Sequence, residues 1–285
     1  MKQHRGILTT IILGMTALAC VVPGLQPASA IPPTPDTRLE RMVAETVSAA
    51  LVLTQQAAPT ATEVPSATPV PTITNTPVIA ASPTQSAESV LDKNTDGTSS
   101  FVDLNGKYQM TVPMQWLAVR INAPEYEIVL ASPDTADPAI QRSLTTIKNQ
   151  DPNVFRLFML DVAPEHIDGG FVTNVNLVWD QQMEVSLADD TDIKGIAATL
   201  PTTLQGAEVT SMGLNLTGNE TPYGVITART PAFTQDGSAI VVIQKLVFFD
   251  LPVGTLTITL STTEKWQSTV EPSFDEFVES FIVLE

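Results

Sequence analysis

The sequence predicts an α+β fold in which helices flank a mostly antiparallel β-sheet. Three observations lead to this prediction. Residues 209–261 hold four strand-like segments in succession, with turn residues between them. Asn105-Gly106, the dipeptide most typical of a tight hairpin, stands between two further strand-like segments. Amphipathic helices are expected just before the four strands and just after them, which is the pattern of a layered α/β/α sandwich.

Composition divides the chain into four parts. Residues 1–30 have the features of an export signal, and residues 31–53 those of an amphipathic helix. Residues 54–98 form a tether rich in Thr, Pro, Ala and Ser, which we expect to be disordered, and residues 99–285 form one globular domain. A domain of about 185 residues buries roughly 70% of its unfolded surface, so its core needs neither a disulfide nor a metal ion.

The export signal has an apolar run, residues 7–19, that is too short for a comfortable membrane span. Two endings stay open. Residues 28–30, Ala-Ser-Ala, favour cleavage before Ile31, whereas residues 16–20 resemble a bacterial lipobox that would leave Cys20 lipidated. Cys20 is the only cysteine in the chain, so we expect neither a disulfide nor a thiol nucleophile in the domain.

The segment after the signal predicts a helix over residues 37–56, which starts with the capping box Thr37-x-x-Glu40. It could pair with a second copy, lie on a membrane or form only transiently. Proline then recurs every few residues between Thr54 and Ala87. Because proline fixes φ and lacks a backbone N–H, we expect an extended spacer that holds the domain away from its anchor.

The first half of the domain predicts strands over residues 101–104, 107–112 and 126–131. An excursion from Asp134 to Asn153 follows and carries a short helix over residues 138–148. We expect this excursion to lie outside the core, because long connections on a rigid sheet commonly carry recognition.

The second half begins with two strands. Residues 155–162 are apolar on both faces and predict a buried strand. Residues 171–179 alternate in part, which predicts a strand with one apolar face and one polar face. The apolar face would hold Phe171, Val175, Leu177 and Trp179, and the polar face Asn174 and Asn176.

Two helices flank the four strands of the meander. The first starts in the acidic residues 189–192 and presents one apolar face. The last is predicted to start at the capping box Ser273-x-x-Glu276 and to bury Phe277 with its neighbours. Of the four strands, residues 239–249 are apolar at almost every position and should be central, whereas residues 255–261 alternate Leu or Ile with Thr.

Two short signatures resemble the PsbP/Mog1-like superfamily. Asn105-Gly106-Lys107-Tyr108 followed by Thr111-Val112-Pro113-x-x-Trp116 is similar to its opening hairpin, and Phe274-x-x-Phe277-x-x-Ser280-Phe281 is similar to its final helix. The resemblance covers residues 99–285. It implies an antiparallel sheet between helices and a non-enzymatic role, either binding partner proteins or supporting photosystem II assembly. The composition of the tether also resembles that of exported proteins from Chloroflexi-type bacteria.

The charge balance excludes several classes of partner. The chain has 31 acidic and 14 basic residues, a formal net charge of −17, which argues against binding to nucleic acid or adsorption on anionic lipid. Membrane contact is expected only through a lipid on Cys20. No Gly-x-Ser-x-Gly motif is present, so a hydrolase would lack its usual nucleophile. No cofactor is expected.

One motif resembles the first half of a calcium-binding loop. Asp92, Asn94 and Asp96 alternate, and Gly97 holds the sixth position, as in loops that offer oxygen ligands to Ca²⁺. Asp103 at the twelfth position would close the loop in place of the usual, longer Glu. The alternative interpretation is a polar hinge at the end of the tether.

Binding residues are expected in the excursion and in the loop over residues 164–170. His166 is the only histidine beyond the signal, and Glu165 and Asp168 could orient it as a general base. The alternative is an ordinary surface histidine. The candidate binding residues are Asp134, Asp137, Arg142, Lys148, Glu165, His166 and Asp168.

The sequence therefore predicts a non-catalytic binding module that is exported, tethered in the cell envelope and able to recognise a protein or peptide. Two alternatives stay open. One is a scaffold component of an envelope complex, self-associating through residues 37–56, and the other is a hydrolase whose site the motifs do not reveal.

Overall fold

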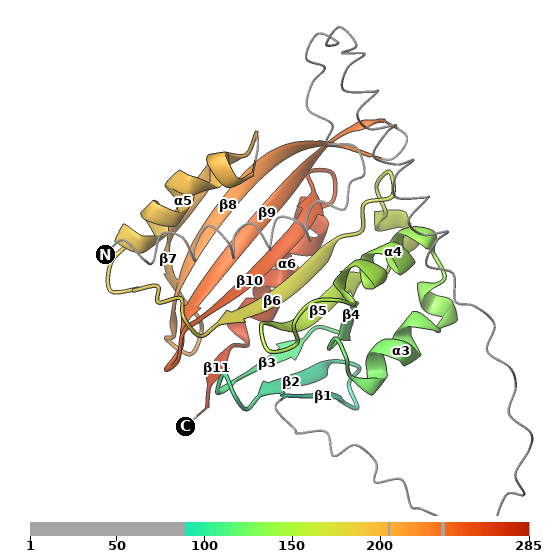
Figure 1. Cartoon of the computed structure of the whole chain (residues 1–285), viewed down its shortest axis with the longest axis horizontal. Coiled ribbons are helices and arrows are strands. Elements are labelled where there is room, and N and C mark those ends of the chain that lie inside the picture. Colours follow the sequence, from blue (N-terminus) through green and yellow to red (C-terminus); the bar gives the residue numbers. More distant parts are fainter. Residues whose placement is uncertain (1–88, 205, 235–236, 285) are drawn as a thin grey trace, which may run out of the picture. The chain divides into compact units, whose positions relative to one another are not determined.

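The computed structural model describes residues 89–204, 206–234 and 237–284, which form two antiparallel sheets and the helices around them (Figure 1). The predictions for the export signal, Cys20, the helix over residues 37–56 and most of the tether lie outside the described residues. None of the described helices is long and apolar enough to cross a bilayer.

The smaller sheet contains the predicted hairpin and two strands that were not predicted from the sequence. Its strand order is β1 (Ser89–Lys93), β2 (Ser99–Asp103), β3 (Tyr108–Val112) and β11 (Ile282–Val283). β1 falls in the segment assigned to the tether, yet all five of its residues pair with β2. The domain boundary at residue 99 is therefore wrong, and the folded part includes residues 89–98.

The larger sheet has seven strands and contains the predicted meander. β9 lies inside this sheet, between β10 and β8, as its apolar sequence predicted. The order across the sheet is β4 (Trp116–Val119), β5 (Phe155–Asp161), β6 (Asn174–Asp180), β10 (Thr255–Thr263), β9 (Ala239–Asp250), β8 (Pro222–Phe233) and β7 (Glu208–Leu216).

Helices lie on both faces of the larger sheet: α4 (Pro138–Ile147) and α5 (Thr191–Thr203) on one, α6 (Gln267–Glu279) on the other (Figure 1). The α+β prediction is confirmed. The strand predicted over residues 126–131 is wrong, because this segment belongs to helix α3 (Pro124–Leu130). A proline in the first turn and nearby glutamates favour a helix start, and they outweigh the short apolar pattern.

The start of the last helix was also misplaced. α6 begins at Gln267, so Ser273 lies inside the helix and does not cap it. The Ser273 hydroxyl donates to the Val270 carbonyl at 2.9 Å and accepts from the Trp116 indole N–H at 3.0 Å. Ser273 therefore links α6 to β4.

The face of the larger sheet beneath α6 and the smaller sheet holds the main core, which we call the packed end. It contains aromatic residues from both sheets and from the C-terminal segment. The Phe249 and Phe281 rings stack with centroids 3.8 Å apart, and Tyr108 lies 5.8 Å from Phe281. The buried apolar face predicted for α6, including Phe277, is confirmed.

A buried ion pair joins the two sheets at the packed end. Arg156 donates to Asp103 from Nε at 2.6 Å and from Nη2 at 3.0 Å, and both side chains are at most 3% exposed. A third bond from Arg156 reaches the Pro152 carbonyl at 2.7 Å. Burial, with the nearby Asp103 carboxylate, holds the pKa of Tyr108 well above its ordinary value.

The opposite face carries two separate apolar clusters. α5 packs on β8 and β9 through residues such as Ile193 and Phe248, as its predicted apolar face required. α4 packs with α3 on β4 and β5, and Ile140, Leu144 and Ile147 are at most 1% exposed. The expectation that the excursion lies outside the core is therefore wrong, although its predicted helix is confirmed.

Between those clusters lies a strip of uncharged polar side chains from β6 and β10. Asn174, Asn176, Ser261 and Thr263 are at most 6% exposed, and each has a side-chain oxygen with no hydrogen-bond partner among the described residues. The alternation predicted for β10 is confirmed, since its Leu and Ile residues point to the packed end. The buried polar strip therefore separates the two apolar clusters on this face.

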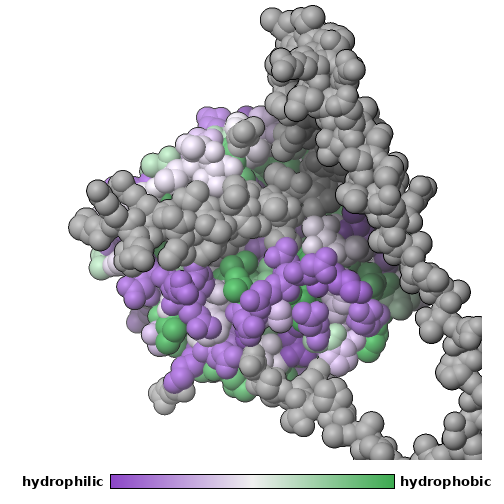
Figure 2. All heavy atoms as spheres, in the orientation of Figure 1, coloured by the Kyte–Doolittle hydropathy of each residue, from purple (hydrophilic) through white to green (hydrophobic). Residues whose placement is uncertain are grey.

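In the orientation of Figure 1 the described surface is mostly hydrophilic, with small separate apolar patches (Figure 2). Single exposed apolar residues such as Met114 and Ile128 are ordinary on a protein surface. Hollows and charged clusters are therefore the stronger candidates for a site.

Candidate functional site

The structure does not bring the proposed calcium ligands together. Asp103 is buried and paired with Arg156, whereas Asp92 belongs to β1. Asp96 Oδ1 accepts bonds from the hydroxyl and the backbone N–H of Thr98, which lower the pKa of Asp96. Within the described ranges no group of three or more His, Cys, Asp or Glu residues could hold a metal ion. The calcium hypothesis is wrong because Asp103 serves the core.

Four charged residues predicted as binding residues lie in or beside the 3₁₀ turn and α4, and Arg142 of α4 has its guanidinium near Gly170 of the loop over residues 164–170. Asp137 caps α4 by accepting from the Ala139 N–H at 2.7 Å, and Lys148 lies 3.4 Å from Glu127. Asp134 lies in a short 3₁₀ turn before the helix, and its side chain is exposed. Apart from Arg142, these side chains therefore act on the helix itself or stand alone in solvent.

His166 is oriented by a residue that the sequence analysis did not name. Its Nδ1 lies 2.5 Å from Asp161 Oδ2, and its ring lies 4.4 Å from that of Trp266. Asp168 instead forms a backbone bridge to Phe171. Among the described residues the hydrogen-bond partner of the His166 ring is the Asp161 carboxylate.

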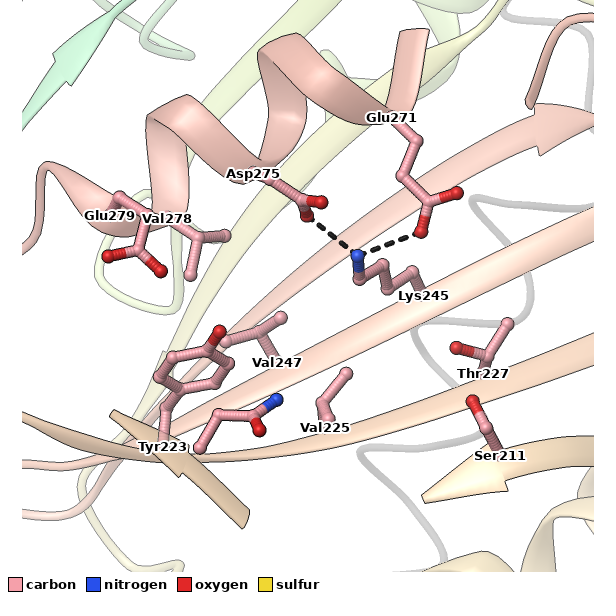
Figure 3. Close-up of a pocket in the computed structure, with 11 residues that line it drawn as sticks. Ser211, Tyr223, Val225, Thr227, Lys245, Val247, Glu271, Asp275, Val278 and Glu279 are labelled. Carbon is pink, nitrogen blue, oxygen red and sulfur yellow. Dashed lines mark hydrogen bonds and ion pairs between the residues drawn. The ribbon is translucent and has the colours of Figure 1, made fainter. Parts of the chain in front are cut away.

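A pocket of about 350 Å³ lies between α6 and strands β7–β9, on the same sheet face as the packed end (Figure 3). We call it the α6 pocket. Strand register places its floor in rows: Ser211, Thr227 and Lys245 lie side by side across the three strands. In the next row Val225 and Val247 lie beside Gly213. Toward β10 the same face becomes core, since Val247 is adjacent to Ile258.

The rim of the α6 pocket is acidic. Glu271, Asp275 and Glu279 stand four residues apart, so they share one face of α6. Lys245 lies between two of them, with Nζ 2.8 Å from Glu271 Oε1 and 2.6 Å from Asp275 Oδ1 (Figure 3). Two carboxylates thus pair with one ammonium, and Glu279 adds a third carboxylate farther along the rim, so the lining carries surplus negative charge.

The contacts of Lys245 keep it charged. Burial alone would lower the pKa of its ammonium, but the hydrogen bonds to Asp275 and Glu271 raise it above the ordinary value of 10.5. Burial, followed by the charges of Glu279 and Asp275, raises the pKa of Tyr223, which stays a neutral hydroxyl. The floor therefore offers one fixed cation, one phenol and small polar groups under an anionic rim.

Glu279 also fixes the turn at one end of the pocket. Its Oε2 accepts from the Gly218 N–H at 2.6 Å, which ties the β7–β8 connection to α6. The Tyr223 ring packs 5.6 Å from Phe249 of the packed end. Both contacts hold the walls of the pocket on rigid elements.

The sequence analysis missed this pocket, although two signals were present. Lys245 is the only charged residue between Ala239 and Phe249, in a strand otherwise described as apolar. The four-residue spacing of Glu271, Asp275 and Glu279 was the second signal. Neither shows that the two groups face each other, because that depends on how α6 crosses β9.

No protein-family model and no curated protein sequence matches the chain. Solved structures similar to it include the cyanobacterial PsbP of Synechocystis sp. PCC 6803, with 16% identity over 67% of this chain and 94% of that chain and a TM-score of 0.41. The Ran-binding protein Mog1p of Saccharomyces cerevisiae has 12% identity over 66% and 96%, with a TM-score of 0.38.

LpqN of Mycobacterium tuberculosis, described as involved in cell envelope biogenesis, has 11% identity over 69% of this chain and 91% of that chain, with a TM-score of 0.35. The PsbP/Mog1-like resemblance seen in the sequence thus recurs in these comparisons as a likeness of fold.

Proposed function

We propose that the domain is a non-catalytic binding module that recognises a protein or peptide partner through the α6 pocket. The observation that supports this most is the surplus of carboxylates over a hollow on a rigid sheet. Glu271, Asp275 and Glu279 outnumber Lys245, so the complementary group is a Lys or Arg side chain of the partner.

The chemistry of the pocket favours binding over catalysis. A nucleophilic lysine needs a lowered pKa, whereas the pKa of Lys245 is raised by its two carboxylate partners. The Tyr223 phenol is likewise kept neutral by burial and by nearby negative charge. These groups suit the fixed hydrogen bonds of a recognition site.

The location we propose follows from the N-terminal sequence. An export signal followed by a Pro-rich tether would hold the module in the cell envelope, anchored by lipid if Cys20 is modified. Replacing Cys20 with Ala should then release the protein from the membrane fraction or stall its processing. Unchanged retention of the Cys20→Ala protein in the membrane would rule out the lipid anchor.

The function is tested by selecting displayed random peptides on the full chain. We expect enrichment of peptides that carry Lys or Arg. The variant Glu271→Gln/Asp275→Asn/Glu279→Gln should lose this enrichment, because it removes the surplus charge of the pocket.

A control with the same change in net charge is Asp134→Asn/Glu165→Gln/Glu184→Gln, at three exposed positions outside the pocket. It should bind the selected peptides like the unmodified chain. Equal loss of peptide binding in both variants would show that binding depends on the overall net charge and not on the pocket. Loss in the control alone would move the site to the loops around Asp134 and Glu165.

A further inference from the structure

We propose that the partner segment binds in extended form, as an added strand on the outer edge of β7, and inserts a Lys or Arg side chain over Gly213 into the α6 pocket. This inference rests on the proposed function and specifies the partner further. The segment should alternate basic with apolar residues, because one side of β7 borders the acidic pocket and the other side is apolar.

The edge of β7 is open to strand pairing. Within the described residues β7 pairs with β8 alone, and it lies at the end of the seven-stranded order. Its nine residues contain no proline and a single charge, Glu208. Edge strands that avoid pairing are usually short or carry proline and inward charges. The opposite edge, β4, is only four residues long, so the exposed length lies at β7.

The side chains on the pocket side of β7 are small enough to let a partner's side chain pass over the strand. Ser211, Gly213 and Asn215 share this side, since they pair with the pocket residues Thr227, Val225 and Tyr223. A Cβ added to Gly213 would meet no atom within 4 Å. The middle of the strand is therefore an entrance to the pocket, and a long cationic side chain can cross it toward the carboxylates of α6.

The other side of β7 is apolar and partly exposed. Met212 is 48% exposed and Leu216 is 62% exposed, and both lie on the side of the sheet that faces α5. An added strand would place every second side chain beside these residues. Apolar residues there and basic residues on the pocket side give the alternating pattern.

A second copy of this chain fits the edge less well than a basic segment. β7 has no basic residue to offer the acidic pocket of its counterpart, and the chain has a net charge of −17. Like charges across an interface oppose association. We therefore assign the edge to a basic, heterologous segment.

The test uses the full chain and a synthetic peptide of alternating Val and Lys, long enough to pair with β7. Two controls are a peptide of equal composition with its lysines in one block and a peptide alternating Val and Glu. Binding is measured by fluorescence anisotropy and located by amide hydrogen exchange. We expect the alternating Val–Lys peptide to bind best and to slow exchange along residues 208–216.

Gly213→Leu should weaken binding of that peptide by at least about tenfold, because the side chain closes the entrance, while the melting temperature stays nearly unchanged. Gly195→Ala, at an exposed glycine of α5 with equally free space, should bind normally. Gly213→Ala should lie between the two.

Four results would overturn strand addition. Binding that leaves β7 exchange unchanged, or that survives Gly213→Leu, would reject the added strand and keep the acidic pocket as a site. No binding at millimolar peptide would reject the pocket as well. A dimer that protects β7 without peptide would assign the edge to a second copy.

Discussion

One face of the larger sheet is covered differently in its two halves. At the packed end, β5, β6 and β10 lie under the smaller sheet and α6, and stacked aromatic rings fill the space between them. Over β7, β8 and the part of β9 around Lys245, residues that are largely polar line a pocket with an acidic rim. The difference indicates that the packed end supplies most of the stability, and under our proposal the α6 pocket, which buries less apolar surface, serves recognition.

The largest effect should come from removing the layer behind the packed end. Deleting residues 136–150 removes α4, whose Ile140, Leu144 and Ile147 are buried against β4 and β5. Several such losses, each about 2–5 kcal/mol, exceed the stability of an ordinary domain. We expect no cooperative melting by circular dichroism. Leu144→Ala gives a milder form, with a loss of about 2–5 kcal/mol, and an unchanged melting temperature there would contradict the assignment of α4 to the core.

The next effect concerns α6, which borders both regions. Phe277 is fully buried at the packed end, so Phe277→Ala should cost about 3–5 kcal/mol in urea unfolding. Val225→Ala, on the half-buried floor of the pocket, should cost about 1 kcal/mol or less. Equal losses at the two positions would remove the distinction between the regions.

Breaking the buried ion pair should cost a comparable unfolding free energy, because it leaves a buried charge unpaired. Arg156→Met leaves the Asp103 carboxylate buried without its partner, which should cost about 3–5 kcal/mol of unfolding free energy. Lys148→Met removes an exposed ion pair with Glu127 and should change stability by less than about 0.5 kcal/mol. If both variants unfold at the same urea concentration as the unmodified chain, the pair does not hold the two sheets together.

A small loss of stability, together with a gain in peptide affinity, is expected from replacing Lys245. Lys245→Met should cost about 1 kcal/mol of unfolding free energy, because its two ion pairs are partly exposed and solvent screens them in part. The same change removes the one cation of the pocket, so basic peptides should bind more tightly. A loss of peptide affinity would show that Lys245 itself contacts the partner.

The difference in unfolding free energy between the unmodified chain and Lys245→Met should depend on pH with a defined sign. The pKa of Lys245 is raised in the folded chain above the ordinary value of 10.5. The ammonium therefore contributes its full stability below the pKa of the unfolded chain, and the contribution is lost as pH rises through the folded-state pKa. The stability gap between the unmodified chain and Lys245→Met should be constant near neutral pH and shrink above about pH 10.

Local patterns predicted most of the scaffold. The meander β7–β10 followed from strands with clear alternation or continuous apolar runs, and the apolar face of α6 followed from the spacing of its phenylalanines. α3 was missed because seven residues are too few to separate a helical from a strand period. β1 was missed because its strand pairing, and not its composition, makes it part of the fold.

The site was harder to predict because it depends on contacts between distant segments. Asp103 fitted a calcium loop by spacing, yet its partner Arg156 lies 53 residues away. Asp161 orients His166 only because β5 ends beside the turn that follows it. In the same way, Lys245 meets Glu271 and Asp275 only when α6 folds back across β9. Composition and local spacing do not reveal these contacts between distant segments.

Recognition through the α6 pocket is best tested by following methyl resonances of the full chain while a basic peptide is added. Val225 lies on the floor of the α6 pocket, and Val175 lies in the core at the packed end. We predict that the Val225 signals shift in a saturable way while those of Val175 stay fixed. Saturable shifts confined to other parts of the domain, with Val225 unchanged, would contradict the assignment of recognition to the α6 pocket.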